Sequence, residues 1–598
     1  MKILKEQIDR ITLGVEGKRI FPQAPTIWFE PDGFVCSCGG KFRVIKTRRK
    51  RIATMEIGEF IAHEAVVCCQ CCGSVRNSEQ LLKLVSHRCK YGFNVIVFIG
   101  RLLFVECKNE REVQEQLRKR NINISIREID YLGKKFIVFL ALAHRESQGR
   151  IKNLLGSKGG YILHLDSTVE GDSPHLMTAL DEIADLVLDN IKIPSEKAEH
   201  IIPFLKRIKK AFGSPIAVTR DMGSGIASAV ADVLPGVPEF ICHYHWLRDI
   251  GKDLFGADYE ALRRGFKAQS IRTSLTNLAR QLKTKIDNNP NLTASLDSYI
   301  AGNINGSPAE KLFPAVMAYT LVLWILDAKR DSRGHGFPFD QPYMSYYQRM
   351  EVVKETLGGL TPLVSTETSI VHLKKIIGRV LNDRTMQKVA AQMKEKISVF
   401  NRLRDAMRIA LPDNRKSLND DGDDVDIKTI EKGVYEFRHA KDLVALAASQ
   451  MPYRKMFKQI DKHWEKLFAD PITITTAHGT FLIQPQRTNN ILERLFRDIK
   501  RRYRRKTGTH SLSKTLKAML ADTVFVRNLD KPEYMALLLN GKTSLEERFA
   551  EIEAKLSRPR DAQQQSNAER ISTKLKKILL IPELPQKLLQ KTKYRLAA

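Results

Sequence analysis

The sequence predicts a multidomain protein in which an α/β core is interrupted by a large all-helical insertion. A zinc ribbon and a helix-turn-helix are expected to precede this core. Three observations predict the organisation: cysteines gather near the N-terminus, apolar runs ending in acids alternate with helices in the middle, and helical periodicity dominates from about 246 to 485. A chain of 598 residues has room for about three or four domains.

Composition points to a polyanionic partner. The formal charge is +30 and the isoelectric point is near 9.7, and such self-repulsion usually reflects binding to nucleic acid. A membrane surface is the competing partner, but the cations are not gathered into one terminal amphipathic arm. The longest apolar run, Leu312–Leu326, is too short to cross a bilayer and contains Pro314, so we expect a buried helix. No signal peptide is visible at Met1–Glu6, so we expect a soluble, cytoplasmic protein with no membrane partner.

The cysteines predict a zinc site. Six of the nine lie between positions 36 and 72, and in a reducing compartment clustered cysteines indicate metal more often than disulfides. The second group offers two overlapping pairs, Cys68 with Cys71 and Cys69 with Cys72, and the glycine that follows Cys72 favours the latter. Between the groups, Lys46–Arg51 is predicted to be a basic hairpin tip that meets phosphates. The alternative is that the cysteines are buried or incidental. The expected zinc ligands are Cys36, Cys38, Cys69 and Cys72.

Residues 91–145 have the pattern of a helix-turn-helix. Val95–Phe98 is strand-like, whereas Glu112–Arg120 is predicted to be a helix. Ser125 is placed to cap a second helix, with Glu128 at the third position of a capping box. A long apolar helix at Phe136–Leu142 would follow. Helix, short turn and helix is a weak signal alone, and the charge and the cysteines strengthen it.

From residue 161 onward, apolar runs that end in an acid alternate with helices. Asp166 and Asp221 each close such a run, and Gly223 opens a helix directly after the second. Ligands of α/β sheets gather at the carboxyl ends of strands, where both aspartates are expected. The predicted strands are Tyr161–Asp166, Ala184–Ile193, Ile216–Asp221 and Glu239–His245, with a helix at Glu196–Phe212.

A basic helix is predicted between Arg487 and Gly508. Thr488 or Asn489 would cap it, and the glycine would close it. Glu493 lies at the flank of the apolar face formed by Leu492, Leu495, Phe496 and Ile499. A plain surface helix in which Glu493 pairs with Arg497 is the simpler alternative. The basic stripe that continues from Glu493 is Arg497, Lys500, Arg501 and Arg504.

The remaining segments carry weaker signals. Asn419–Asp426 lacks calcium-loop spacing and is predicted to be a solvated acidic loop. A helix is expected from Ser511 to about Asn528. The tail beyond Ser557 is expected to be a partly ordered basic arm with an amphipathic helix at Ile571–Leu580.

Two aspartates at strand ends and one glutamate on a helix form a set of hard oxygen ligands suited to Mg²⁺ or Mn²⁺. A pair of such ions promotes phosphodiester displacement. A single aspartate at a strand end is more often a cap or turn residue, but two in the same context favour the metal. Glu260 or Glu310 would be the alternative third acid.

Four motifs together resemble the Mutator-like transposases. These include bacterial insertion-sequence enzymes with a ribonuclease H-like fold and an Asp-Asp-Glu triad. The resemblance covers roughly 160–255 and 485–525, and helical material is inserted between them. The motifs are Leu-Asp-Ser-Thr at Asp166, Thr-Arg-Asp-Met-Gly at Asp221, Cys242-His243-Tyr244-His245, and Thr488–Glu493.

The resemblance implies a DNA transposase that binds the terminal inverted repeats of a mobile element. Asp166, Asp221 and Glu493 would hold two Mg²⁺ or Mn²⁺ ions for strand cleavage and strand transfer. Cys242 and His245 would order the active site or touch DNA. The partners would be element ends and target DNA, with a homodimer or larger assembly on the prokaryotic nucleoid. Phosphate contacts would come from Arg494, Arg497, Lys500, Arg501, Arg504 and Arg505.

Two other functions fit the same residues. The chain would be a catalytically silent, transposase-derived DNA-binding protein if cleavage were lost, although all three acids are present. It would be a structure-specific nuclease of the same fold if it cut without joining. The predicted domains are a zinc-ribbon-like segment (1–90), a helix-turn-helix-like domain (91–150), the ribonuclease H-like core in two parts (151–250 and 485–530), an all-helical insertion (251–484) and a basic helical tail (531–598).

Overall fold

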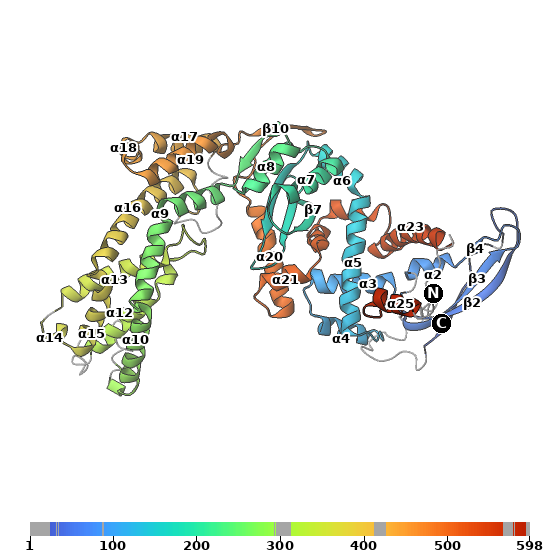
Figure 1. Cartoon of the computed structure of the whole chain (residues 1–598), viewed down its shortest axis with the longest axis horizontal. Helices are drawn as coiled ribbons and strands as arrows, with labels where there is room; N and C mark the ends of the chain where they lie inside the picture. The colour runs from blue at the N-terminus through green and yellow to red at the C-terminus, as the bar shows by residue number, and fades with distance from the viewer. Residues whose placement is uncertain are drawn as a thin grey trace. The chain divides into compact units, whose positions relative to one another are not determined.

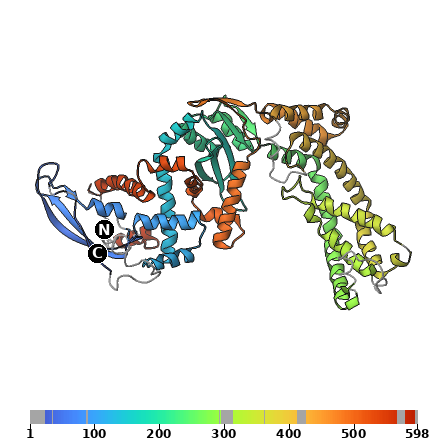
Figure 2. The ribbon, with the colours of Figure 1, turned by 180° about the vertical axis from the view of Figure 1, so that it is seen from behind.

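The computed structural model describes residues 24–31, 33, 35–86, 89–291, 293–294, 313–360, 362–411, 426–565, 578 and 580–593. The chain forms two compact units (Figures 1 and 2). Unit 1 combines Met1–Ile151 with Lys500–Ala598, and unit 2 is Lys152–Ile499. Three expectations lie wholly or largely outside the described residues. They are Glu310, the acidic loop at Asn419–Asp426 and the helix at Ile571–Leu580.

Unit 1 begins with a small sheet in the order β1-β3-β2, and β4 pairs with β3. The strands are β1 (Thr26–Phe29), β2 (Phe42–Thr54), β3 (Gly58–Cys69) and β4 (Val75–Arg76). β2 and β3 are antiparallel, whereas β1 runs parallel to β3. The prediction of a hairpin tip at Lys46–Arg51 is wrong, because this segment lies inside β2. An edge strand can hold alternating basic residues that remain in solvent.

Helices complete the N-terminal part of unit 1. They are α2 (Glu79–Leu84), α3 (Phe93–Gly100), the π-helix η1 (Arg101–Val105), α4 (Glu110–Lys119) and α5 (Ile126–Glu146). The strand expected at Val95–Phe98 is wrong. The segment is the middle of α3, and a short apolar run does not distinguish a buried strand from a buried helix. Gly100 permits close packing there, since an added Cβ would lie 2.1 Å from Cγ of Phe136.

The two helices expected after Glu112 are present. Asn109 caps α4 in a capping box with Glu112, and the Ser125 hydroxyl accepts the N–H of Glu128 at the start of α5. The apolar segment Phe136–Leu142 is not a third helix, because α5 is continuous through it.

The C-terminal part of the chain returns to unit 1. Its elements are α21 (Leu512–Ala518), the 3₁₀ helix η5 (Ala521–Asp530), α22 (Pro532–Leu539), α23 (Leu545–Gln565) and α25 (Leu584–Lys593). The single helix expected from Ser511 to Asn528 is therefore interrupted. Phe549 of α23 contacts Phe136 and Phe139 of α5, and His144 Nδ1 lies 2.9 Å from the Tyr534 hydroxyl. These contacts join the two ends of the chain into one core.

Unit 2 is built on a five-stranded sheet in the order β7-β6-β5-β8-β9. The strands are β5 (Ile162–Thr168), β6 (His175–Asp181), β7 (Leu186–Ile193), β8 (Ala217–Arg220) and β9 (Glu239–Ile241). β6 is antiparallel to both neighbours, whereas β8 and β9 run parallel to β5. Three predictions change: β6 was not foreseen, β5 continues two residues beyond Asp166, and the last strand ends at Ile241 because a helix begins at His243.

Helices α6 (Gln148–Ser157), α7 (Ala198–Phe212) and α8 (Ser224–Val233) accompany the sheet, and α7 packs along α8. From β9, α9 (His243–Ala268) leads into a helical region in both views (Figures 1 and 2). A core of buried apolar side chains runs through this region from Ile241 to Phe468. Its further helices are α10 (Ile271–Asp287), α12 (Phe313–Leu326), η3 (Ala328–Asp331), α13 (Pro342–Gly358), α14 (Pro362–Ser365), α15 (Thr368–Leu381), α16 (Arg384–Met407), α17 (Ile427–His439), α18 (Lys441–Ser449) and α19 (Met451–Leu467).

The apolar run at Phe313–Leu326 is helical, as expected, but it is buried on one side only. Val322 and Ile325 are fully buried, whereas Leu323 and Trp324 are exposed. In the part of the chain that the structure describes, no helix has the length and apolar character needed to cross a membrane. A ribbon of β10 (Ile472–Thr476) and β11 (Gly479–Ile483), which was not predicted, returns the chain to the sheet and to α20 (Asn490–Thr507).

Candidate functional site

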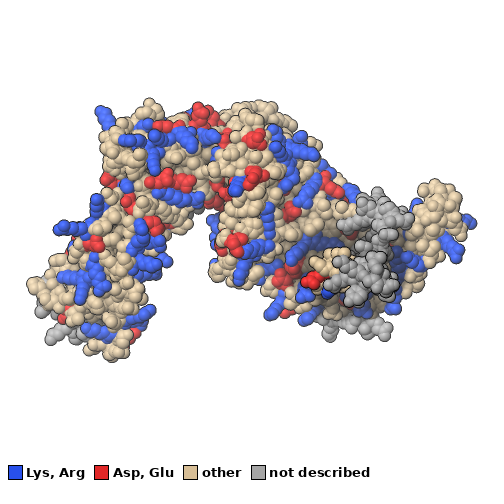
Figure 3. Space-filling view, in the orientation of Figure 1, with Lys and Arg blue, Asp and Glu red and all other residues tan. Residues whose placement is uncertain are grey.

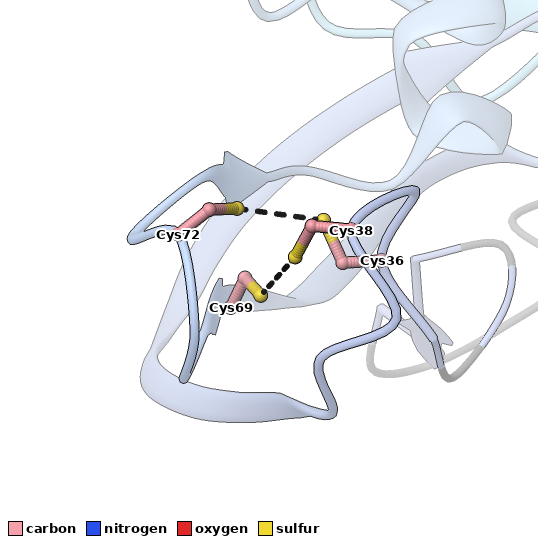
Figure 4. Close-up of side chains that lie close together, drawn as sticks. All are labelled: Cys36, Cys38, Cys69 and Cys72. Carbon is pink, nitrogen blue, oxygen red and sulfur yellow. Dashed lines mark hydrogen bonds between the residues drawn. The ribbon is translucent and has the colours of Figure 1, made fainter.

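The four predicted zinc ligands lie together at the end of the small sheet in unit 1 (Figure 4). One sulfur from each cysteine falls within 4.8 Å of every other. Cys36 Sγ is 3.7 Å from Cys72 Sγ, and Cys38 Sγ is 3.4 Å from Cys69 Sγ. Among the described residues, this is the only group of three or more His, Cys, Asp or Glu side chains that converges so tightly. The arrangement matches the tetrahedral thiolate set of a structural zinc site.

The structure also decides between the two overlapping cysteine pairs. The Cys68 thiol donates to the carbonyl of Gly73 at 3.4 Å and stays outside the group, as does the exposed Cys71. A hydrogen bond from the backbone N–H of Cys38 lowers the pKa of Cys36 to about 6. Because the thiolate is the metal-binding form, a group already ionised near neutral pH is suited to zinc.

The three predicted acids come from separate elements of unit 2. Asp166 lies in β5 and is buried, Asp221 directly follows β8, and Glu493 lies in the first turn of α20. α20 runs beside the sheet (Figures 1 and 2). Glu260, the alternative third acid, is exposed on α9, and both of its carboxylate oxygens accept from Nε of Arg263. It therefore contributes nothing to this group.

The three carboxylates interact electrostatically. Burial raises the pKa of Asp166 well above its usual range, and the neighbouring charges of Asp221 and Glu493 raise it further. Burial also raises the pKa of Asp221 and of Glu493. In the described part of the chain, the three carboxylates do not all lie within 4.8 Å of one another. Buried like charges of this kind are costly until a cation neutralises them.

A buried hydrogen-bond network joins the start of α20 to β5. Asn489 Nδ2 donates to the carbonyl of Leu165 at 2.9 Å, and Asn489 Oδ1 lies 2.8 Å from Nδ1 of His164. The other ring nitrogen of His164 lies 2.9 Å from the Glu182 carboxylate, which also accepts from the backbone N–H of Gln486. Asn489 was one of two residues expected to cap α20, the other being Thr488, but the side chain of Asn489 bonds to β5 instead. These hydrogen bonds tie the start of α20, which carries Glu493, to the strand that carries Asp166.

Cys242 and His245 adjoin the same site. Cys242 Sγ accepts the backbone N–H of Asn489 at 3.3 Å, and burial raises the pKa of this thiol to about 12. His245 Nε2 lies 3.5 Å from Glu493 Oε1, and burial lowers the pKa of the imidazole to about 3. Both side chains are therefore neutral at physiological pH. His243, from the same motif, forms a hydrogen bond with the carbonyl of Leu467, 2.5 Å from its Nε2. Cys242 therefore contacts the residue before α20, and His245 contacts the side chain of Glu493.

Two charged residues at the site were missed by sequence reasoning. Glu196, before α7, raises the pKa of both Asp166 and Asp221, and its carboxylate accepts from the hydroxyl of Ser167. Arg248 lies one turn after His245 on α9. Its positive charge acts to lower the pKa of both Asp221 and Glu493, and it is the cation that these two acids share. Its Nε is buried and has no hydrogen-bond partner within the described part of the chain. The only sequence signal for Arg248 is its helical spacing from Cys242 and His245.

The predicted phosphate-binding residues share one helix. All six are exposed on α20: Arg494, Arg497, Lys500, Arg501, Arg504 and Arg505. Two other cations of this helix are used for packing, since Arg502 donates to the carbonyl of Phe104 at 3.4 Å and Lys506 pairs with Glu110 at 2.7 Å. Lys and Arg side chains are scattered over the visible face, among fewer Asp and Glu side chains and a larger area of other residues (Figure 3).

Comparisons with known proteins give little further information. No protein-family model matches the chain, and no curated protein matches it. Among solved structures, the chain is similar to the Drosophila P element transposase strand transfer complex, with 8% sequence identity and a TM-score of 0.29. The match covers 77% of this chain and 94% of that one. Similarity at this level carries no argument about fold or function.

Proposed function

We propose that the chain is a DNA transposase of the Mutator-like kind, which cleaves and joins DNA strands with an Asp-Asp-Glu triad. The observation that carries the proposal is that the charges of Asp221 and Glu493 both raise the pKa of the buried Asp166, while Asn489 ties the start of α20 to β5 through the carbonyl of Leu165. Asp166 and Glu493 are 327 positions apart in the sequence (493 − 166), yet the charge of Glu493 raises the pKa of Asp166. The strand order, in which three antiparallel strands are followed by two parallel ones, is compatible with the ribonuclease H-like core that the resemblance implies.

The donor set fits two hard divalent ions. Carboxylate oxygens are the preferred ligands of Mg²⁺ and Mn²⁺, and the repulsion within this group is relieved by cations. In such sites the two ions lie about 3.5–4 Å apart, so the outermost ligands do not meet at one point. Bound ions would activate the attacking hydroxyl and stabilise the leaving oxygen.

The other residues have roles around the acids. Arg248 supplies a cation beside Asp221 and Glu493, where its positive charge would favour the approach of a phosphate group. The exposed cations of α20 bind the DNA backbone, which sets affinity and salt dependence rather than sequence preference. Reading of the terminal repeat is assigned to the zinc-binding segment (1–90) and the helix-turn-helix-like segment (91–150). Since two element ends must be bridged, we propose that the protein acts as a dimer or larger assembly.

The direct test is cleavage of the DNA that flanks the reading frame. The protein is incubated with each element end and Mg²⁺ or Mn²⁺, and the cut strands are mapped. Asp166→Asn and Glu493→Gln should each lower the cleavage rate by about 10³-fold or more, as expected for members of an interdependent catalytic set. Both variants should still bind the element ends.

Glu260→Gln is the matched control, because it removes an exposed acid that is paired with Arg263. It should cleave at the wild-type rate. Normal strand transfer by Asp166→Asn or Glu493→Gln would refute the site. Cutting without joining, and without preference for an inverted repeat, would favour a structure-specific nuclease. End binding without any cutting in Mn²⁺ would favour a catalytically silent DNA-binding protein.

A further inference from the structure

An aromatic and basic surface covers the outer face of the small sheet in unit 1. Trp28 of β1, His63 of β3 and Arg49 of β2 lie side by side in register across the three strands. The Trp28 side chain is 64% exposed, and its ring centroid lies 4.6 Å from that of His63. We call these three residues the Trp28 row. A tryptophan left this exposed on a small sheet is unusual, because burying the ring elsewhere would be favourable.

The opposite face of the sheet explains why this one is free. Phe60, Ala62 and Val66 of β3 are fully buried on the inner face. The residues of β3 alternate between faces, so His63 belongs to the outer one. Trp28 and Arg49 share that face with His63, as the ring contact with Trp28 confirms. The sheet is therefore packed on one side and open to solvent on the other.

The charge of this surface favours an anionic ligand. Within the described residues, Arg49 of this face has no carboxylate partner, whereas Arg51, two positions further along β2 on the same face, is paired with Glu59 at 3.5 Å. Basic residues on an edge strand also prevent pairing between edges of neighbouring molecules. That purpose does not require an exposed tryptophan on β1, at the other edge of the sheet. The combination of a free aromatic ring with an unpaired cation is typical of nucleic-acid binding.

We propose that the Trp28 row binds single-stranded DNA, with an unpaired base stacked on Trp28 and the neighbouring phosphate held by Arg49. A duplex exposes the flat faces of its bases only at its ends, so a stacking platform selects an unpaired strand. The inference goes beyond strand cleavage and would hold equally for a catalytically silent DNA-binding protein. It requires no metal at the acid cluster.

A second exposed aromatic pair, on α17, lacks the unpaired positive charge that binding to DNA requires. Tyr435 of α17 is 54% exposed, and its ring centroid lies 4.0 Å from that of His439. Both residues line a cavity of about 620 Å³. The cations there are already neutralised: Lys428 pairs with Asp470 at 2.7 Å, and Arg438 pairs with Asp461 at 2.9 Å. Because its charges are largely balanced, this pair lacks the attraction for phosphate that the Trp28 row has.

The test measures binding of the full chain to a fluorescein-labelled 20-mer of deoxythymidine by anisotropy, with EDTA present so that cleavage plays no part. Trp28→Leu keeps an apolar side chain against His63 but cannot stack, so affinity should fall by about 5- to 150-fold. Trp28→Phe should retain most of the affinity. Arg49→Ala should weaken binding and reduce the slope of log K against log salt by about 0.7.

Trp324→Ala and Tyr435→Ala are the matched controls, since each removes another exposed aromatic ring. Both should bind the oligonucleotide as the wild type does. Wild-type affinity in Trp28→Leu with an unchanged zinc content would overturn the proposal. So would a change in sedimentation of Trp28→Leu without a change in binding, which would indicate that the face contacts a second copy. Either failure leaves the cleavage assay unaffected, so the two proposals are tested separately.

Discussion

The two candidate metal sites differ in how the chain brings their ligands together. The cysteine group lies within 37 consecutive positions (36–72) on two loops beside one sheet, and its four sulfurs already converge within 4.8 Å. The acid group draws on a strand, a strand end and a helix from distant parts of the chain, and its carboxylates stay further apart. A converged and closed set suits an ion that holds structure, whereas an open, mutually repelling set suits ions that hold a substrate.

The largest expected effect is at the cysteine group. Cys69→Ser should remove the zinc ion and unfold the small sheet, because structural zinc supplies on the order of 10 kcal/mol to small zinc domains. Metal content by mass spectrometry and hydrogen exchange of residues 26–76 measure the two consequences. Cys68→Ser, one position away, should keep one zinc per chain. Zinc retained by Cys69→Ser and lost by Cys68→Ser would reverse the ligand assignment.

An intermediate effect is expected at the network that places Glu493. Asn489→Ala removes the hydrogen bonds to Leu165 and His164 and leaves buried polar groups unpaired, at about 1–3 kcal/mol each. We expect the cleavage rate at saturating DNA to fall by about 10- to 100-fold, with little change in the concentration of DNA needed for half-maximal rate. Single-turnover cleavage over a range of DNA concentrations measures both quantities.

The neighbouring residue provides the control for that network. Asn490→Ala changes the same residue type at the first position of α20 and should alter the cleavage rate by no more than a few-fold. An equal loss in both variants would show that the start of α20 as a whole, rather than the Asn489 network, is required. An unchanged rate in Asn489→Ala would show that Glu493 is placed by other contacts.

The smallest effect concerns stability without metal. The pKa of Asp166 lies well above its usual 3.8 in the folded protein, so the folded state keeps a proton that the unfolded chain has already released. Stability therefore falls as the pH rises through that window, and the full penalty applies above the folded pKa. Asp166→Asn should raise the melting temperature in EDTA at neutral pH, by about 2–4 °C for each kcal/mol of repulsion removed.

Two controls test that prediction, one at low pH and one with a variant at another acid. The difference between Asp166→Asn and wild type should vanish at a pH below 3.8, where the carboxyl is neutral in both states. Asp498→Asn, which removes an exposed acid of α20, should leave the melting temperature unchanged. A lower melting temperature for Asp166→Asn in EDTA at neutral pH would mean that the carboxylate is already compensated without metal.

What could be read from the sequence follows from how local each feature is. The cysteine set and the cap of α5 depend on short spacings, and both are present in the structure. Glu196 and Arg248 could not be predicted, because their approach to the acids depends on tertiary packing. The loop carrying Glu196 can approach α8 only because residue 225 is glycine: an added Cβ would lie 1.7 Å from the Glu196 carbonyl oxygen.

The predictions of secondary structure were wrong where the apolar pattern was the only signal. Val95–Phe98 is rich in β-branched residues, yet it forms a buried helix, since burial on all sides removes the periodicity that distinguishes the two. β6 escaped prediction because its residues, His175–Asp181, do not alternate clearly between polar and apolar. In the structure, β6 is an interior strand that pairs with β5 on one side and β7 on the other, and this pairing outweighs local preference.

The most direct test of the central claim is to locate Mn²⁺ by anomalous diffraction in crystals of the protein bound to an element end. We predict two manganese peaks about 3.5–4 Å apart. They should be ligated by Asp166, Asp221 and Glu493, and Asp221→Asn should lose at least one of them. Manganese absent from this position, or bound there without Glu493, would contradict the account.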